Sequence, residues 1–519
     1  MIRFQAFLVA LLLLSGTATP QDDPDQERIR LIHANSLEFD RSMGTDARRL
    51  IGDVRFKHGK ATMDCDSAYL YSGKERLKAY GNVHIIHNDS IHLYGDSLRY
   101  DGSERKARLR SNVKVKDPEM TLRTDTLVYD ISRSTAFYRG GGKLKVHDSQ
   151  QRLKSRRGTY YADIQRMHFE EDVRLKHPDY RLYSDTLEYE TTERIAHFEG
   201  PTVMRTGKET VYCEGGWYNL KKDRSMLTED PYVARKASVL KADTLRYRRE
   251  GGKGKAVGRV YLRNGSRALR AFSGKGTFRR GASWVRLIEN PVLVRRFEED
   301  TLYLRADTIR AKKDSITKKF RVMAYPRVRF FRRDLQGKCD SMSYEERDST
   351  ARLFQEPVLW SGKDRIAGDT VLIRSDGEGV SSLEIPSDPF LSSRKDSTYF
   401  DQMKGKEMKA WFSDRDRIRR IMIRGNGRTI HFPKEKGKEE GWIGMNRTES
   451  AHIDIRFQKG KMRSIRFIQK PTATLYPMKD LEKGMLHLKG FRWNEKGRAR
   501  QPEDVMRGAW IHGRDRLRR

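Results

Sequence analysis

Apolar residues alternate with mainly polar ones in short runs along most of the chain. One run places Leu77, Ala79, Gly81, Val83 and Ile85 on alternate positions. Side chains of a β-strand alternate between two faces with a period of two, so this run predicts a strand with one buried face. Short polar segments that favour turns separate such runs, which predicts antiparallel β-hairpins.

A short phrase of the form Asp/Asn-Ser/Thr-Leu-x-Tyr/Phe recurs through the sequence. Its clearest copies lie at residues 34–40, 95–101, 124–130, 184–189 and 242–247, and weaker copies fill the gaps. The acidic positions follow one another at a step of about 29 to 33 residues, as Asp66, Asp96 and Asp125 show. A fixed period of this length is typical of repeat architectures. We therefore predict about twelve repeat units over residues 31–392.

A second phrase follows about fifteen residues after the first, as in Gly81-Asn82-Val83, with proline in later units such as Asn290-Pro291-Val292. The alternation also shifts by one residue at each acidic position. Leu122 and Thr124 occupy even positions before Asp125, whereas Leu127 and Tyr129 occupy odd positions after it. A bulge or sharp corner at the acid would keep both halves facing the same side. Each unit is thus predicted to be a bent hairpin.

Stacked bent hairpins form a folded-over sheet with an apolar trough inside and charged residues outside. At ~4.8 Å per strand, twelve units would extend roughly 110 Å. A right-handed parallel β-helix is the alternative fold, but the alternating turns favour antiparallel hairpins. Residues 393–477 carry degenerate copies, predicted to be further β-repeats or a cap, and residues 478–519 form a basic C-terminal tail.

Composition changes this picture little. The chain has 519 residues, of which 36% are hydrophobic, and its formal net charge is +35. It is too polar for several membrane-spanning helices, and 10% aromatic residues argue against wholesale disorder. A repeat array needs contacts only between neighbouring units, so a modest apolar fraction suffices for an elongated all-β fold.

The first residues predict export. A basic start is followed by an apolar run over residues 4–14 and then by small residues, the pattern of a secretory signal peptide within residues 1–20. A cleaved signal is favoured over an uncleaved anchor, because the run is shorter than the ~20 residues that span a bilayer. Three widely spaced cysteines, Cys65, Cys213 and Cys339, suggest neither a disulfide framework nor a zinc site.

The two phrases together resemble the OstA-like family, which includes LptA-type proteins and the N-terminal periplasmic part of LptD-type proteins, here in the long form seen in Bacteroidetes-type bacteria. The match is strongest over residues 31–130. The resemblance implies a β-jellyroll with a V-shaped cross-section, an interior that holds the lipid A acyl chains of lipopolysaccharide, and end-to-end joining. The implied partners are other Lpt-type OstA-domain proteins at the inner and outer membranes, and further copies of the chain.

The predicted lining of the trough comes from the Leu-x-Tyr positions. These residues are Leu37, Phe39, Leu98, Tyr100, Leu127, Tyr129, Leu187 and Tyr189. The alternative is that they pack only against each other, as the core of a passive structural or adhesive β-solenoid of the cell envelope. The repeated acid is expected to shape the corner, since a catalytic pair would not recur in most units.

No other chemistry is expected from the sequence. The cations are spread over all units, which argues against a nucleic-acid site and is compatible with attraction to anionic headgroups. His84 and His92 would share one strand face and His87 the other, so we expect no metal there. We expect no catalytic residues and no cofactor. The predicted function is lipopolysaccharide binding and transport for outer-membrane assembly. The predicted location is the periplasm, with association with the outer membrane left open.

Overall fold

The computed structural model describes residues 29–39, 47–58, 61–87, 89–116, 118, 120–147, 151–248, 250–279, 284–376, 379–413, 417–434, 441–458 and 461–508. The predicted signal peptide lies outside these residues. The described chain is all-β and its strands pair antiparallel, as the alternation predicts. No helix in these ranges is long and apolar enough to cross a bilayer. The chain divides into two compact units: unit 1 is Met1–Lys236 with Thr244–Arg249, and unit 2 is Ala237–Asp243 with Glu250–Arg519.

Unit 1 consists mainly of long strands, each paired with its neighbours along the chain. The strands are β1 (Arg30–His33), β2 (Ser36–Phe39), β3 (Ala47–His58), β4 (Ala61–Tyr71), β5 (Arg76–His87), β6 (Ile91–Asp101), β7 (Lys106–Lys116), β8 (Met120–Asp130), β9 (Thr135–Val146), β10 (Arg152–Tyr161), β11 (Arg166–Lys176), β12 (Tyr180–Glu190), β13 (Ile195–Thr206), β14 (Thr210–Asn219), β15 (Arg224–Thr228), β16 (Tyr232–Arg235) and β18 (Thr244–Arg248). A 3-10 turn, η3 (Ser72–Lys74), joins β4 to β5.

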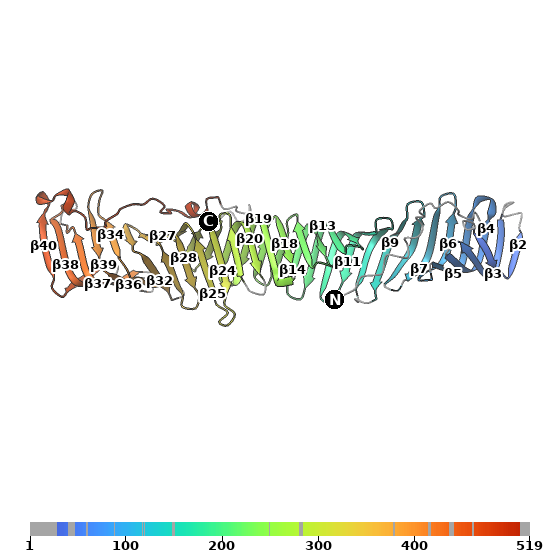
Figure 1. Cartoon of the computed structure of the whole chain (residues 1–519), viewed down its shortest axis with the longest axis horizontal. Coiled ribbons are helices and arrows are strands. Elements are labelled where there is room, and N and C mark those ends of the chain that lie inside the picture. The colour runs from blue at the N-terminus through green and yellow to red at the C-terminus, as the bar shows by residue number, and fades with distance from the viewer. Residues whose placement is uncertain are drawn as a thin grey trace. The chain divides into compact units, whose positions relative to one another are not determined.

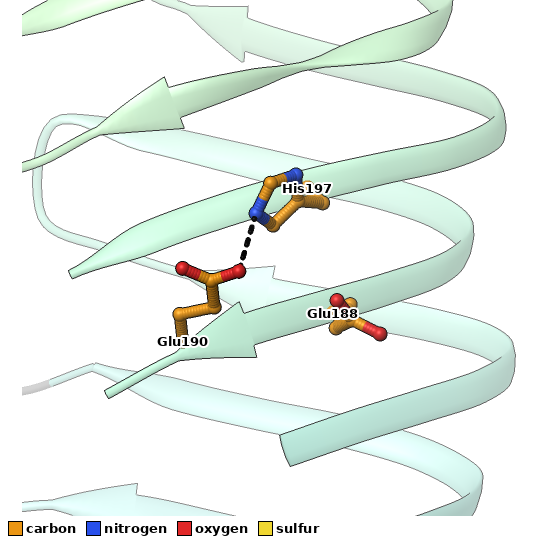
Figure 2. Close-up of side chains that lie close together, drawn as sticks. All are labelled: Glu188, Glu190 and His197. Atoms are coloured by element: carbon orange, nitrogen blue, oxygen red, sulfur yellow. Dashed lines mark ion pairs between the residues drawn. The ribbon is translucent and has the colours of Figure 1, made fainter. Parts of the chain in front are cut away.

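Long strands of unit 1 bend at the two phrases. Between β7 and β8 the register moves from the pair Arg110–Thr126 to the pair Val113–Thr124, so two residues of β7 face only Asp125. These two, Ser111 and Asn112, have left-handed φ angles of 60° and 53°. The predicted bulge at the acid is confirmed, and its two-residue side belongs to the second phrase. Figure 2 shows strands of this unit turning back at the bend.

The bend divides each long strand into two arms. Arm 1 carries the Leu-x-Tyr positions, such as Leu127 and Tyr129 of β8, and arm 2 is the part across the bend, such as Leu122. The corner acid accepts a hydrogen bond from the second phrase of the next strand, as in Asn112 Nδ2 to Asp96 Oδ2 at 2.7 Å. Short polar side chains therefore hold the corner, as their turn chemistry predicts.

Unit 2 has shorter strands. They are β17 (Ser238–Lys241), β19 (Lys253–Asn264), β20 (Leu269–Arg279), β21 (Trp284–Ile288), β22 (Val292–Arg296), β23 (Thr301–Arg305), β24 (Thr308–Lys313), β25 (Phe320–Tyr325), β26 (Val328–Phe331), β27 (Gln336–Cys339), β28 (Ser341–Glu345), β29 (Thr350–Phe354), β30 (Val358–Ser361), β31 (Asp364–Ala367), β32 (Thr370–Ser375), β33 (Val380–Ile385), β34 (Phe390–Arg394), β35 (Phe400–Lys404), β36 (Glu407–Ser413), β37 (Arg417–His431), β38 (Gly444–Gln458), β39 (Lys461–Ile468) and β40 (Thr472–Pro477). Two 3-10 turns, η4 (Glu250–Gly252) and η5 (Gly265–Arg267), flank β19.

Proline accounts for breaks at the second phrase of unit 2. Glu289-Asn290-Pro291 separates β21 from β22, and both flanking strands pair with β20. Proline has no backbone N–H to donate to a ladder, and the strand ends there, although β13 of unit 1 runs on through its own proline. Other strands of unit 2, such as β23 and β24, separate at the corner acid without a proline, so the two arms are mostly separate strands.

The last described residues, 478–508, leave the sheet after β40 and run back over strands of unit 2 (Figure 1). We call them the C-terminal segment; it contains η6 (Met478–Asp480), η7 (Lys483–Met485) and the short helix α1 (Pro502–Met506). Its Leu488 is buried with Phe390 and Phe432, and its Val505 is buried with Val292 and Tyr303. This segment covers the face of arm 2 that points away from the core.

Candidate functional site: the inner face of unit 1

The predicted leucines form one buried row along arm 1. Leu98, Leu127 and Leu187 are each only 5% exposed. Strand pairing brings the row together, because Leu98 faces Leu109 and Leu109 faces Leu127 on adjacent strands. The strand period of two thus places the same position of each unit on one continuous line.

A second row runs beside the leucines and carries the predicted tyrosines. Tyr100, Tyr129 and Tyr189 are half-buried, and each faces an alanine on at least one adjacent strand. Ala107 faces both Tyr100 and Tyr129, so each ring has room above a small neighbour. Tyr160 belongs to the same row and was absent from the predicted set, although its weaker copy of the phrase has the same spacing.

Burial changes the chemistry of these phenols. It raises the pKa of Tyr129, with Asp163 and Asp130 adding to the effect, and it raises the pKa of Tyr160 to about 12. Both therefore stay neutral at physiological pH. The Tyr129 hydroxyl is buried and has no hydrogen-bond partner among the described residues. An unpaired buried hydroxyl is costly, so this position favours a polar group of a ligand.

Arm 2 supplies an opposite wall that the predicted set did not include. Leu122, Leu144, Leu153 and Leu175 lie in register on β8 to β11. Nearer the start of the unit, Leu122 packs directly against the buried cluster that contains Leu127. The alternation in the sequence could have revealed this row, since each of these leucines lies between polar residues.

Small residues line the corner between the arms. The slot before the corner acid holds Ser184, whose hydroxyl donates to the Thr186 carbonyl at 2.8 Å and lies 2.7 Å from the Thr202 hydroxyl. Cys65 and Cys213 occupy equivalent slots and are buried. Burial, with nearby carboxylates, raises the pKa of each thiol to about 12. These cysteines are therefore unreactive corner residues.

Tyr138 crosses the interior at one point. Its ring starts on arm 1 of β9, and its hydroxyl lies 2.6 Å from the hydroxyl of Ser155 on arm 2 of β10. Gly142 and Gly158 make room for the ring, because a Cβ at either position would lie within 2.4 Å of a ring carbon. This buried cross-link narrows the apolar interior locally.

The remaining two predicted residues lie on β2, the short second strand. Leu37 is 44% exposed and Phe39 is 71% exposed. Leu37 faces Leu50 of β3, so it continues the leucine row to this strand.

Histidines and acids gather on outer faces. His84 and His92 contact each other at 3.1 Å, which confirms their predicted shared face. Figure 2 shows a second group, Glu188 and Glu190 of β12 with His197 of β13, whose ligand atoms lie within 4.8 Å of one another.

Arg166 of β11 forms ion pairs with both acids of this second group. Its guanidinium reaches Glu188 at 3.1 Å and Glu190 at 2.9 Å, and His197 lies 3.3 Å from Glu190. The arginine supplies the positive charge that a metal ion would bring. The group is therefore an ion-pair network on the outer face of arm 1.

Comparison with known proteins agrees with the repeated phrases. Residues 26–185 match the family of OstA-like proteins, so the predicted resemblance is confirmed over these residues. No curated protein sequence matches the chain. A solved structure that is similar is LptH of Pseudomonas aeruginosa, described as the LptA homologous periplasmic component of the conserved lipopolysaccharide transport device. It has 20% sequence identity over 21% of this chain and 80% of that chain, with a TM-score of 0.19.

Proposed function

We propose that this protein binds lipopolysaccharide in the periplasm and holds lipid A acyl chains against the inner face of unit 1, as a transport component for outer-membrane assembly. One observation carries the proposal: apolar rows on both arms continue from strand to strand, with buried leucines near the corner and half-buried Tyr100, Tyr129 and Tyr189 beside them. The half-buried rows are the part that a lipid can reach.

The energetics suit an acyl chain. Burying one methylene contributes about 0.8 kcal/mol, so a chain that covers several strands can offset the cost of spreading the arms. The rows lack charged residues, and the unpaired Tyr129 hydroxyl can donate to an ester or amide oxygen of the lipid. The match to OstA-like proteins supports the same class of cargo.

Exposed terminal strands support the proposed partners, namely Lpt-type OstA-domain proteins at the two membranes and further copies of this chain. In unit 1, β2 is exposed along its whole length, including Phe39. In unit 2, β40 is mostly exposed, including Leu475 at 54%. An exposed apolar edge strand is a template for pairing with another sheet.

Photo-crosslinking tests the proposal. A photoreactive residue at Tyr129 or Tyr189 should capture lipopolysaccharide in cells. Val128 and Glu188 are the matched controls, because they neighbour these tyrosines and point to the outer face. Equal capture at the inner and outer positions would contradict lipid binding. It would favour a passive envelope solenoid, in which the same rows only pack against each other.

A further inference from the structure

The outer face of arm 2 in unit 1 carries a regular array of positive charge. On β9, β10 and β11 the two outward positions are Lys143 and Lys145, Arg152 and Lys154, and Arg174 and Lys176. The intervening Leu144, Leu153 and Leu175 point inward. All six cations are exposed. We call these six residues the basic face.

Strand pairing places like charges directly opposite one another. Lys143 faces Lys154, and Lys154 faces Arg174, on adjacent strands. The second row repeats this, because Arg152 lies between Lys145 and Lys176. Like charges in opposite cross-strand positions destabilise a sheet. The opposed cations therefore do not stabilise the fold.

The basic face has almost no internal neutralisation. Among the described residues, one ion pair reaches it, between Arg174 Nε and Asp172 Oδ1 at 2.8 Å. The neighbouring strands extend the array, since the outward positions of arm 2 carry two lysines on β7 and one arginine each on β8, β12 and β13. No described residue at these outward positions is acidic.

Arm 1 of β9 to β12 differs, because acids stand among its cations. Its outer face has an opposed pair of arginines, Arg139 and Arg157. On β11 and β12, however, it mixes Arg166 with Glu170, Glu188 and Glu190, and Arg166 pairs with two of these acids. A general need for a soluble, charged surface would act on both arms alike. The one-sided charge points to a ligand for arm 2.

The form of the face indicates which ligand. Cations on a sheet lie about 4.8 Å apart between strands and about 7 Å apart along a strand, which makes a flat grid rather than a pocket. Interfaces between proteins are depleted of lysine at the centre and anchored by aromatic side chains, whereas four of these six residues are lysines. Single-stranded nucleic acids bind by stacking successive bases on a series of exposed rings. Beside the basic face one ring is exposed among the described residues, that of Tyr183 opposite Arg174, so such a series is lacking.

We propose that the basic face docks unit 1 onto an anionic phospholipid bilayer, with the headgroups spread over the grid. Cations near such a surface each favour binding by about fivefold. The face lies on the other side of arm 2 from the apolar rows, so this contact is separate from the proposed lipid cargo. Docking would therefore leave the inner face free.

Vesicle co-sedimentation of the full chain tests this. We expect binding to vesicles of 70% phosphatidylcholine and 30% phosphatidylglycerol at low salt, and little binding to pure phosphatidylcholine. The variant Lys143→Gln, Lys154→Gln and Lys176→Gln should bind about 100-fold more weakly. The control is Arg99→Gln, Arg110→Gln and Arg139→Gln, which removes three exposed cations from the outer face of arm 1. It should lose no more than a few-fold.

Three outcomes would overturn the proposal. Equal losses in the two triple variants would show that net charge, not the face, determines binding. Absence of binding to the anionic vesicles would exclude the membrane. Binding of poly-glutamate or an oligonucleotide through the face, without vesicle binding, would assign it to an acidic protein or a nucleic acid. Crosslinking of lipopolysaccharide at Tyr129 should be unchanged in both triple variants. This would show that each result concerns vesicle binding and not the proposed cargo site.

Discussion

The two units use the outer face of arm 2 in opposite ways. In unit 1 it carries the basic face. In unit 2 the corresponding positions include Val292, Tyr303 and Trp360, which are buried. The C-terminal segment covers part of this apolar face, and Gln402 fixes it by donating to the Leu486 carbonyl at 2.7 Å and accepting from the Leu488 N–H at 2.8 Å.

The residues that follow the corner at the second phrase also differ between the two units. Both units place a left-handed pair at the corner, Gly81-Asn82 in unit 1 and Glu289-Asn290 in unit 2. In unit 2 Pro291 follows this pair and the strand ends, and Val292 lies on the outer face where β7 carries Lys114. The outer face of arm 2 in the same repeat can thus carry charged residues that contact solvent or ligands, or apolar residues that pack against another part of the chain.

Removal of the C-terminal segment should have the largest effect. A chain ending at Pro477 exposes the surfaces that bury Leu488 and Val505, each worth about 1.5 to 3 kcal/mol. We expect unit 2 to lose on the order of 5 kcal/mol or more. Hydrogen exchange should accelerate in β26 and β34 and stay unchanged in β7 to β10. A chain ending at Gly508 is the control, and equal exchange in the two truncated chains would contradict a stabilising role.

The second-largest effect should come from replacing a glycine at a corner of unit 1. Gly81 has a φ of 74°, and an added Cβ would lie 2.2 Å from Asp66 Oδ2. Gly81→Ala combines backbone strain with this clash, so we expect a loss of about 2 kcal/mol in urea unfolding. Gly207→Ala is the control, because a Cβ there meets nothing within 4 Å. If both variants lose the same stability, the left-handed geometry of Gly81 does not stabilise the corner.

The sequence repeat made much of the fold and of the buried leucine row predictable. Hairpins and corners depend on neighbours in sequence, so the shift of alternation at Asp125 was sufficient to locate the bulge. The buried positions of Leu98, Leu127 and Leu187 follow from the same period. The C-terminal segment follows no period, and its Leu488 and Val505 contact strands far away in sequence. The one-sided charge of the basic face appears only when strand pairing places Lys143, Lys154 and Arg174 side by side.

Interior hydroxyls offer a third comparison. In unit 1 the ring over Gly142 is Tyr138, bonded to Ser155, whereas in unit 2 the ring over Gly337 is Phe330. Tyr138→Phe removes a buried hydrogen bond and should cost about 1 kcal/mol by thermal unfolding. Tyr129→Phe is the matched control and should be neutral or slightly stabilising, since its hydroxyl has no partner among the described residues. The reverse order would show that the Tyr138 cross-link adds no stability.

The smallest effect should come from the outer face of arm 1, where both units carry acid–base pairs. In unit 2, the hydrogen bond from Lys409 lowers the pKa of Glu384. A carboxylate with a lowered folded pKa contributes stability above its unfolded value of about 4.5, and this contribution is lost as the pH falls below that value. Glu384→Gln should therefore cost less than about 1 kcal/mol at pH 7, and this cost should decrease as the pH falls through the lowered pKa of Glu384.

Glu407→Gln, at an exposed position of β36, controls for removing an acid from the same region. A cost for Glu384→Gln that did not decrease as the pH falls would mean that packing of this side chain, and not its charge, stabilises arm 1. The difference between the units would then extend beyond arm 2, because arm 1 of unit 1 relies on Arg166 and its two acids.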